Sequence, residues 1–158
     1  MEPKKSKAPE ILNKKARRNY DIQETLEAGI VLVGTEVKSL REGRAEIGDA
    51  HVMPAANGDL MLINLRIEPY KNAGAFNHEE TRSRKLLLHR REIEKLAVKV
   101  REKRLTIVPL KVYFNPKGRV KVLVGVGKGK QSADRRQDEK KAQAQKEMAQ
   151  AIKNFNRS

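Results

Sequence analysis

Side chains suited to catalysis are few in this 158-residue chain and do not cluster along it. The three histidines lie far apart and lack the close spacing of metal ligands. Asp49 and His51 share a face of a predicted strand, but no nucleophile accompanies them. No serine lies in a nucleophile-elbow pattern, and no cluster of carboxylates could hold a metal for a nucleic-acid enzyme. We therefore expect a protein that is not an enzyme and needs neither a metal nor a cofactor.

Positive charge is the strongest functional signal. The chain has 35 Lys and Arg against 20 Asp and Glu, for a net charge of +15. Residues 1–20 hold seven basic and two acidic residues, and residues 128–158 hold nine basic and four acidic ones, so the two ends carry much of the excess. A charge of this size favours a polyanionic partner, most often nucleic acid. A generally basic, solvated surface is the alternative interpretation.

Other composition features exclude several classes of protein. Without cysteine there is no disulfide scaffold and no Cys-ligated zinc or iron–sulfur site. No apolar run reaches the length of a membrane-spanning helix, and the lysine-rich start leads into no apolar segment typical of a secretory signal. We therefore expect a cytoplasmic protein without a membrane partner.

Short strands dominate the middle of the chain. Between residues 21 and 32 the even positions are apolar except Glu24 and alternate with polar ones, which predicts a half-buried strand. Asn57-Gly58 and the segment 115–118 are turn signals between further apolar segments. The other predicted strands are 49–53, 60–67, 82–89, 105–114 and 120–126.

Two helices interrupt these strands. One is predicted over 36–42, with Thr35 as its N-cap and Gly43 as its stop, and the other over 90–103. Five to seven strands with two small helices predict a β-rich fold, and we expect an OB-like closed antiparallel barrel. The expected organisation is a basic arm over 1–12, a barrel over 13–130 and a basic tail over 131–158.

Basic clusters lie on this core and before it. Five Lys or Arg residues fall between 82 and 91, and four more precede Tyr20. Since the chain has only six aromatic residues, we expect recognition of a folded RNA by shape and phosphate contact rather than by base stacking. Each cluster taken alone is also compatible with a solvated surface.

The tail is rich in helix formers but has only a short apolar stripe, formed by Met148, Ile152 and Phe155. We expect it to be disordered alone and to become helical in a polyanionic channel. An inert, frayed tail is the alternative.

Several segments together carry a family resemblance. They are Asn13-Lys14-Lys15-Ala16-Arg17 with Tyr20, Glu27-Ala28-Gly29-Ile30, Gly34-Thr35-Glu36-Val37-Lys38-Ser39-Leu40-Arg41, Arg84-Lys85-Leu86-Leu87-Leu88-His89 with Glu92-Ile93, and Gly125-Val126-Gly127-Lys128-Gly129-Lys130. In order and spacing, from about residue 11 to 136, the chain resembles the SsrA-binding protein family (small protein B, SmpB). Members of this family are partners of transfer-messenger RNA (tmRNA).

The resemblance implies an OB-like barrel that binds the tRNA-like domain of tmRNA and brings it to stalled ribosomes for trans-translation and peptide tagging. It implies that the C-terminal tail enters the empty mRNA channel near the decoding site of the small subunit. Elongation factor Tu would be an indirect partner through charged tmRNA, and the protein would be a monomer.

The resemblance also assigns roles to individual residues. The RNA-binding positions that it implies are Asn13, Arg17, Tyr20, Glu27, Lys38, Arg41, Arg84, Lys85, Leu87, Lys121, Lys128, Gly129 and Lys130. The tail positions that it implies at the decoding site are Asp134, Arg135, Arg136, Met148, Ile152 and Lys153. Ala133 stands where many relatives have an aromatic residue or His, so no stacking ring is expected there. A different RNA-binding OB module, whose function would survive loss of residues 131–158, is the alternative.

Overall fold

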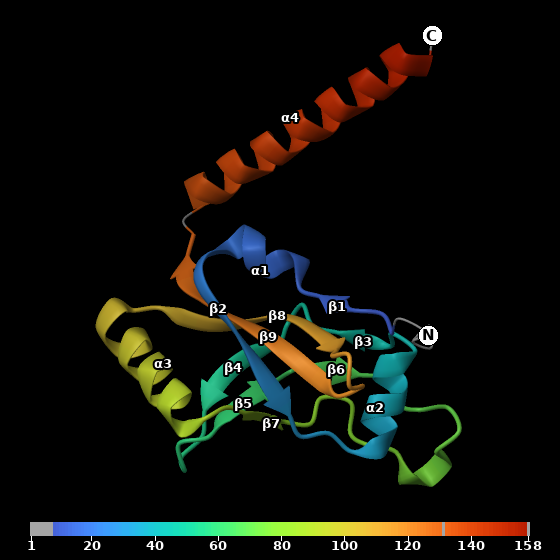
Figure 1. Cartoon of the computed structure of the whole chain (residues 1–158), viewed down its shortest axis with the longest axis vertical. Coiled ribbons are helices and arrows are strands. Elements are labelled where there is room, and N and C mark those ends of the chain that lie inside the picture. Colours follow the sequence, from blue (N-terminus) through green and yellow to red (C-terminus); the bar gives the residue numbers. More distant parts are fainter. Residues whose placement is uncertain (1–7, 131, 158) are drawn as a thin grey trace.

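The computed structural model describes residues 8–130 and 132–157. Its centre is a seven-stranded antiparallel sheet, with a separate two-stranded sheet beside it (Figure 1). The large sheet has the order β1 (Ile11–Leu12), β8 (Thr106–Phe114), β9 (Val120–Gly129), β2 (Tyr20–Ile30), β7 (Arg84–Leu87), β5 (Leu60–Ile63) and β4 (His51–Pro54), and the small one pairs β3 (Ala45–Glu46) with β6 (Arg66–Ile67).

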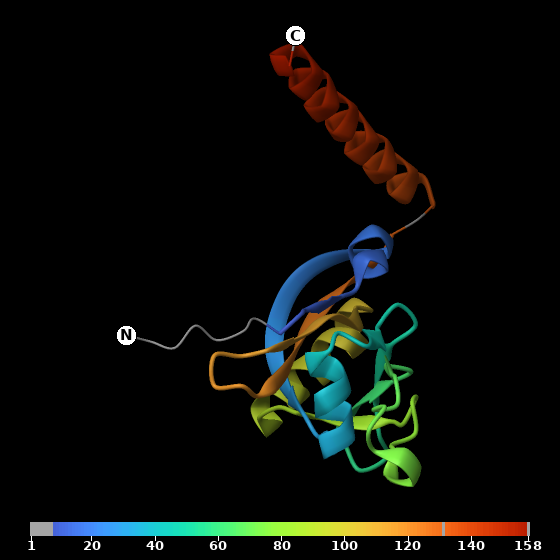
Figure 2. The same cartoon turned by 90° about the vertical axis from the view of Figure 1, so that its right-hand side faces the viewer.

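Four α-helices and one 3₁₀ turn complete the described chain. They are α1 (Lys14–Asn19), α2 (Gly34–Arg41), η1 (Gly74–Phe76), α3 (Arg90–Lys103) and α4 (Ser132–Arg157). Helices α2 and α3 lie on opposite sides of the body, and α4 extends away from it beyond α1 (Figures 1 and 2).

The large sheet curls without closing. Strand β4, at one edge, comes close to β8, but no hydrogen-bonded pairing joins them in the described part of the chain. Pro54 in β4 and Pro109 in β8 have no N–H to donate to such a pairing, and β1 already occupies the far end of β8. The predicted β-rich antiparallel fold is therefore confirmed, whereas closure of a barrel is not.

The alternation predicted for β2 is observed, with one important change. Leu26, Ala28 and Ile30 face the main core, together with Val122 and Val124 of β9. A β-bulge shifts the register at Gln23, because Ile22 pairs with Gly127 while Glu24 pairs with Val126. One extra residue reverses which side a strand residue faces, so Ile22 points to the opposite side of the sheet.

That opposite side carries a second, smaller apolar cluster beneath α1. Ala16 of α1 packs there with Val108 and Leu110, and Tyr20, Ile22 and Leu123 surround them. The glycines of β9 make room for it. A Cβ atom on Gly127 would lie 2.1 Å from the Asp21 carbonyl oxygen, and one on Gly125 would lie 2.9 Å from Leu110 Cδ1. Gly125 and Gly127 are therefore required by packing.

Helix α2 starts earlier than predicted and uses a different cap. The Val33 amide donates to Glu36 Oε1 at 2.9 Å, whereas the Thr35 hydroxyl bonds the Nδ1 atom of His78 at 2.9 Å. The prediction of Thr35 as N-cap is therefore wrong, because the carboxylate of Glu36 reaches back to the chain first. The predicted stop is confirmed, since Gly43 follows the helix with a φ of +74°.

Glu36 also forms a buried ion-pair cluster that joins α2 to the sheet. Its carboxylate accepts hydrogen bonds from Arg84 Nε and from Arg82 Nη2, the latter at 2.5 Å. Arg84 further donates to the carbonyl oxygens of Leu65, at 2.5 Å, and Glu80, at 3.1 Å. Both Glu36 and Arg84 are 0% exposed, and their charged groups are hydrogen-bonded within the fold, whereas the Nε atom of Arg82 is buried without a partner among the described residues.

The ionisation of this cluster follows from its hydrogen bonds. Burial by itself raises the pKa of Glu36, but the bonds from Arg82, the Val33 amide and Arg84 outweigh it, and the pKa lies below its ordinary value of 4.5. Burial lowers the pKa of Arg84 and outweighs the opposing effect of Glu36. At neutral pH the pair is charged on both sides.

Glu36→Gln should lower the free energy of unfolding by about 3 kcal/mol at neutral pH, because it leaves a buried guanidinium without its counter-charge. Since the pKa of Glu36 is lowered by folding, its contribution is complete above about pH 4.5 and is lost as the pH falls through the folded-state pKa. The wild type should therefore lose stability more steeply in acid than the variant. Urea unfolding followed by circular dichroism measures both effects.

The matched control is Glu42→Gln, which breaks the exposed 3.2 Å pair with Arg44. It should cost less than about 1 kcal/mol. Equal losses for the two variants would contradict a structural role for the buried cluster.

Gly127→Ala should destabilise the protein by at least about 2 kcal/mol, because the new Cβ would collide with the backbone of the β2 bulge. Gly129→Ala is the control, since its Cβ would meet only Tyr20 Cε1 at 3.9 Å. Thermal unfolding of both variants gives the comparison. A Gly127→Ala protein as stable as the control would show that the bulge is not held by this close approach.

Candidate nucleic-acid interface

The side of β7–β2–β9–β8 that faces away from the main core presents a continuous surface, here called the outer face. The pairing of neighbouring strands places its residues in two rows that run across the sheet. Gly29 of β2 lies opposite both Leu87 of β7 and Lys121 of β9, and Lys121 lies opposite Tyr113 of β8. In the next row Glu27 lies opposite Leu123, which lies opposite Lys111. Residues two apart share a face, so Lys85 joins Leu87 on this surface. The outer face comprises Glu27, Lys85, Leu87, Lys111, Tyr113, Lys121 and Leu123.

The outer face therefore brings together four residues predicted to bind RNA: Glu27, Lys85, Leu87 and Lys121. Leu87 is 50% exposed, although it is a leucine in a strand. Lys85 lies within 3.4 Å of Asp59. The mixture of exposed apolar surface with lysines suits contact with both sugar and phosphate of a folded RNA.

The outer face has a polar connection that the sequence did not reveal. The hydroxyl of Tyr113 donates a hydrogen bond to Glu27 Oε2 across the strands. The Lys111 ammonium lies 4.8 Å from the centre of the Tyr113 ring and 3.5 Å from Glu10. Partial burial and then the neighbouring carboxylate of Glu27 raise the pKa of Tyr113 to about 12. Tyr113 therefore remains protonated and keeps donating at physiological pH.

Tyr113, Lys111 and Leu123 were missed as candidate residues. The signal that could have found them is the alternation of 105–114 and 120–126, which places these side chains on the same face as Lys121. Choosing that face needed the strand register, because the hairpin alone does not say which side of it is covered.

A second group of predicted residues lies at the end of the sheet from which α4 extends (Figure 1). Tyr20 pairs with Gly129, and the Lys130 amide donates to the Asn19 carbonyl at 2.7 Å. The Lys130 ammonium also reaches the carbonyl of Arg17, at 3.3 Å. Arg17 and Lys128 are exposed there. The end of β9 and the end of α1 thus present their basic side chains together.

Helix α2 carries Lys38 and Arg41, two further exposed residues of the predicted RNA-binding set. The Lys38 ammonium lies 5.3 Å from the centre of the Tyr70 ring, and the Arg41 guanidinium lies 5.7 Å from that of Phe114. These contacts hold two long side chains at the surface of α2, which lowers the entropy that either loses on binding a phosphate.

Two predicted contact residues are not available on the surface. Arg84 is fully buried in its pair with Glu36, so its side chain is not exposed where the RNA contact is expected, and that contact stays a prediction. Asn13 is 8% exposed and caps α1, since its Oδ1 accepts from the Ala16 amide and its Nδ2 donates to the Pro109 carbonyl. Asn13 holds α1 against β8, and Arg84 holds α2 against β7. A strand pattern cannot distinguish a surface arginine from one that enters the core to meet a carboxylate.

The predicted tail residues lie on α4, which extends away from the body (Figures 1 and 2). Met148 and Ile152 are exposed on it, as are Arg136 and Lys153. The structure does not describe the side chains of Asp134 and Arg135. The tail therefore presents apolar and basic side chains that nothing in the described body covers.

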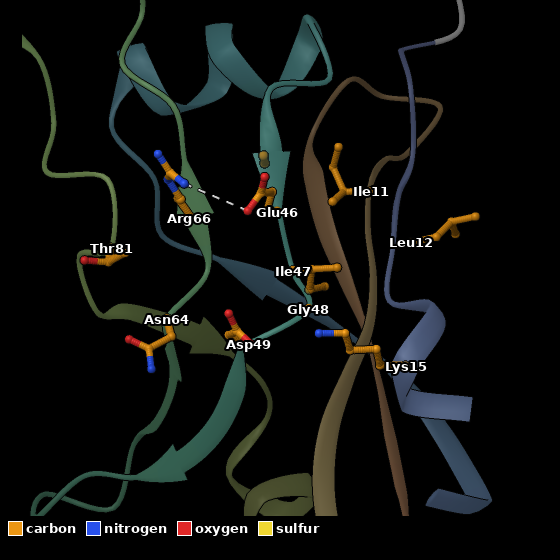
Figure 3. Close-up of a pocket in the computed structure, with 11 residues that line it drawn as sticks. Ile11, Leu12, Lys15, Glu46, Ile47, Gly48, Asp49, Asn64, Arg66 and Thr81 are labelled. Carbon is orange, nitrogen blue, oxygen red and sulfur yellow. Dashed lines mark ion pairs between the residues drawn. The ribbon is translucent and has the colours of Figure 1, made fainter. Parts of the chain in front are cut away.

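A cleft of about 720 Å³ separates β1 and α1 from β3 and the segment that follows it. Figure 3 shows Lys15, Asp49, Asn64 and Thr81 around it. Arg66 at its wall is paired with Glu80 at 2.9 Å and lies 4.0 Å from Glu46. The cleft contains none of the RNA-binding positions that the family resemblance implies, and its Arg66 is paired with carboxylates.

The described residues contain no group of three His, Cys, Asp or Glu side chains arranged to hold a metal ion. Over 8–130 and 132–157, no helix combines the length and apolar content needed to cross a membrane.

Comparison with known proteins gives consistent matches over almost the whole chain. An SsrA-binding protein of Moorella thermoacetica is 52% identical over 141 residues, 89% of this chain and 90% of the relative. One of Symbiobacterium thermophilum is 50% identical over 145 residues, 92% and 91% of the two chains. One of Methylobacterium radiotolerans is 49% identical over 155 residues, 97% and 98% of the two chains.

A solved structure agrees with the fold. A chain in the structure described as "tmRNA-SmpB: a journey to the center of the bacterial ribosome" matches with a TM-score of 0.65 and 48% identity, over 79% of this chain and 87% of that one. The family model described as SmpB protein matches residues 10–154. With that match and relatives of about 50% identity spanning most of both chains, this chain belongs to the SmpB protein family.

Proposed function

We propose that this chain binds the tRNA-like domain of tmRNA and delivers it to stalled ribosomes for trans-translation, with rescue of the ribosome and tagging of the peptide. The observation that carries this function is membership of the SmpB family, supported by a structural match to SmpB with tmRNA and the ribosome. The protein acts by binding RNA and is not an enzyme. The net charge of +15 agrees with partners that are both polyanions.

The body provides the tmRNA contact in this proposal. The outer face supplies Lys85 and Lys121 for phosphates, Leu87 for sugar or base contact, and Glu27 for a hydrogen-bond donor of the RNA. Arg17, Tyr20, Lys128, Gly129 and Lys130 extend the contact toward the tail, and Lys38 and Arg41 extend it along α2. Asn13 supports this surface by holding α1, and Arg84 supports it from below by holding α2.

The tail provides the ribosome contact. Residues 131–158 enter the empty mRNA channel near the decoding site, where Asp134, Arg135, Arg136 and Lys153 meet RNA and Met148 with Ile152 meet an apolar surface. The RNA-binding body of the proposal is 13–130. Of the arm expected over 1–12, residues 1–7 lie outside the described residues and Ile11–Leu12 pair with β8 as part of the sheet. The protein works in the cytoplasm as a monomer and meets elongation factor Tu only through charged tmRNA. That the tail is disordered before it binds stays a prediction.

Labelled tRNA-like domain of tmRNA should remain bound to the full chain at physiological salt in excess ordinary tRNA or duplex RNA. Contacts shaped to one folded RNA survive competitors that share only its charge. A fluorescence-anisotropy competition titration measures this. Equal displacement by every competitor would contradict the proposed function and leave a general RNA-binding module.

Removal of residues 131–158 should leave affinity for the tRNA-like domain within about threefold, because the proposed tmRNA surface is on the body. The same truncation should abolish peptide tagging in a reconstituted translation system stalled on a truncated mRNA. A matched control scrambles residues 137–158 while keeping their composition, and it should tag poorly as well if the order of side chains along α4 matters. Normal tagging by the truncated chain would contradict the tail's role.

A further inference from the structure

Glu27 is an unusual residue for a surface that meets a polyanion. It lies in the middle of the outer face, exposed, and a carboxylate there repels phosphate. In the described part of the chain it forms no ion pair that would neutralise it, and its hydrogen-bond partner is the hydroxyl of Tyr113. Lys85 and Lys111 lie on strands other than that of Glu27. Lys85 pairs with Asp59 and Lys111 with Glu10, rather than with Glu27.

Such a carboxylate is chemically suited to one task. An ionised carboxylate is an acceptor only, with two oxygens. Oε2 of Glu27 accepts from Tyr113, which leaves Oε1 without a partner among the described residues. A hydrogen bond from an N–H or O–H group to a charged oxygen is about twice as strong as one between neutral groups. Glu27 can therefore distinguish an RNA group that donates from a phosphate that does not.

Tyr113 is built to hold this carboxylate in one orientation. Tyr113 lies opposite Lys121, in the cross-strand row next to that of Glu27. The Lys111 ammonium lies 4.8 Å from the centre of the Tyr113 ring. Its raised pKa of about 12 keeps the proton on the phenol. A long glutamate side chain fixed before binding loses less entropy when the RNA arrives.

We propose that Tyr113 is a positioning residue that fixes the Glu27 carboxylate, so that its free oxygen Oε1 accepts a hydrogen bond from a donor of the bound RNA, either the 2-amino group of a guanine or a ribose 2′-hydroxyl. The inference rests on the proposed function, since it takes the outer face as the tmRNA surface. It adds a selection rule, because an RNA that places a phosphate at Glu27 is repelled while one that places a donor there is held.

Tyr113→Phe tests this by removing only the hydroxyl. In the full chain it should weaken binding of the tRNA-like domain about tenfold, since a hydrogen bond to a charged group is lost. The slope of log affinity against log salt should not change, because no phosphate contact is removed. Lys121→Ala should do the reverse and reduce that slope by about one. Thr81→Val is the control, because it removes an exposed hydroxyl at the cleft and not on the outer face, and it should bind as the wild type does.

A double-mutant cycle separates positioning from packing. Glu27→Ala should weaken binding, and Tyr113→Phe should have no further effect when Glu27 is already Ala. Tighter binding by Glu27→Ala would overturn the proposal, because it would mean that the carboxylate only repels the RNA. Additive losses in the double variant would overturn the coupling of Tyr113 to Glu27.

The donor is identified with modified RNAs. Single 2′-deoxy substitutions remove a hydroxyl, and single guanosine-to-inosine changes remove an amino group. One modified RNA should lose affinity for the wild type but not for Glu27→Ala, and none doing so would overturn the acceptor role. If the wild type fails the competition test, the proposed function itself fails. If it passes and both variants bind normally, only the present inference fails.

Discussion

The buried contact between Glu36 and Arg84 is the constraint on which the two sides of this protein depend. It joins the first turn of α2 to the start of β7 and also fastens the chain at Leu65 and Glu80. A buried ion pair adds little net stability compared with apolar residues of the same size, yet it is costly to break. Its effect is therefore to fix geometry: α2 and β7 stay in one relation, with Lys38 and Arg41 on one element and Lys85 and Leu87 on the other.

The β-bulge at Gln23 is the second feature that determines the position of the outer face. It turns Ile22 away from the main core, so both sides of the β8–β9–β2 region become partly covered. Helix α1 packs on the new apolar cluster, and Gly125 and Gly127 allow the close approach. Beyond the bulge the same side of the sheet is open and forms the outer face. One extra residue thus separates the part of the sheet that holds α1 from the part that is free to meet RNA.

Charge and shape have different tasks on this protein. The lysines and arginines give attraction to any polyanion, which is why charge alone does not define a partner. Leu87 gives apolar contact, and the Glu27–Tyr113 pair adds a directed hydrogen-bond acceptor within a basic surface. The α4 helix extends away from the body, and its Met148 and Ile152 are exposed.

Local periodicity and composition were enough to predict the β-rich class, the strands around Leu26 and Val122, the span of α3 and the basic character of both ends. The family motifs in the sequence also marked Glu27, Lys85, Leu87 and Lys121. Tertiary packing was needed to show that Arg84 turns inward to Glu36 and that the side-chain amide of Asn13 is buried against the Pro109 carbonyl. It also decided that Tyr113 meets Glu27 and that the sheet stays open. The Arg84–Glu36, Tyr113–Glu27 and Asn13–Pro109 hydrogen bonds join residues 48 to 96 positions apart, and no local pattern encodes a contact at that separation.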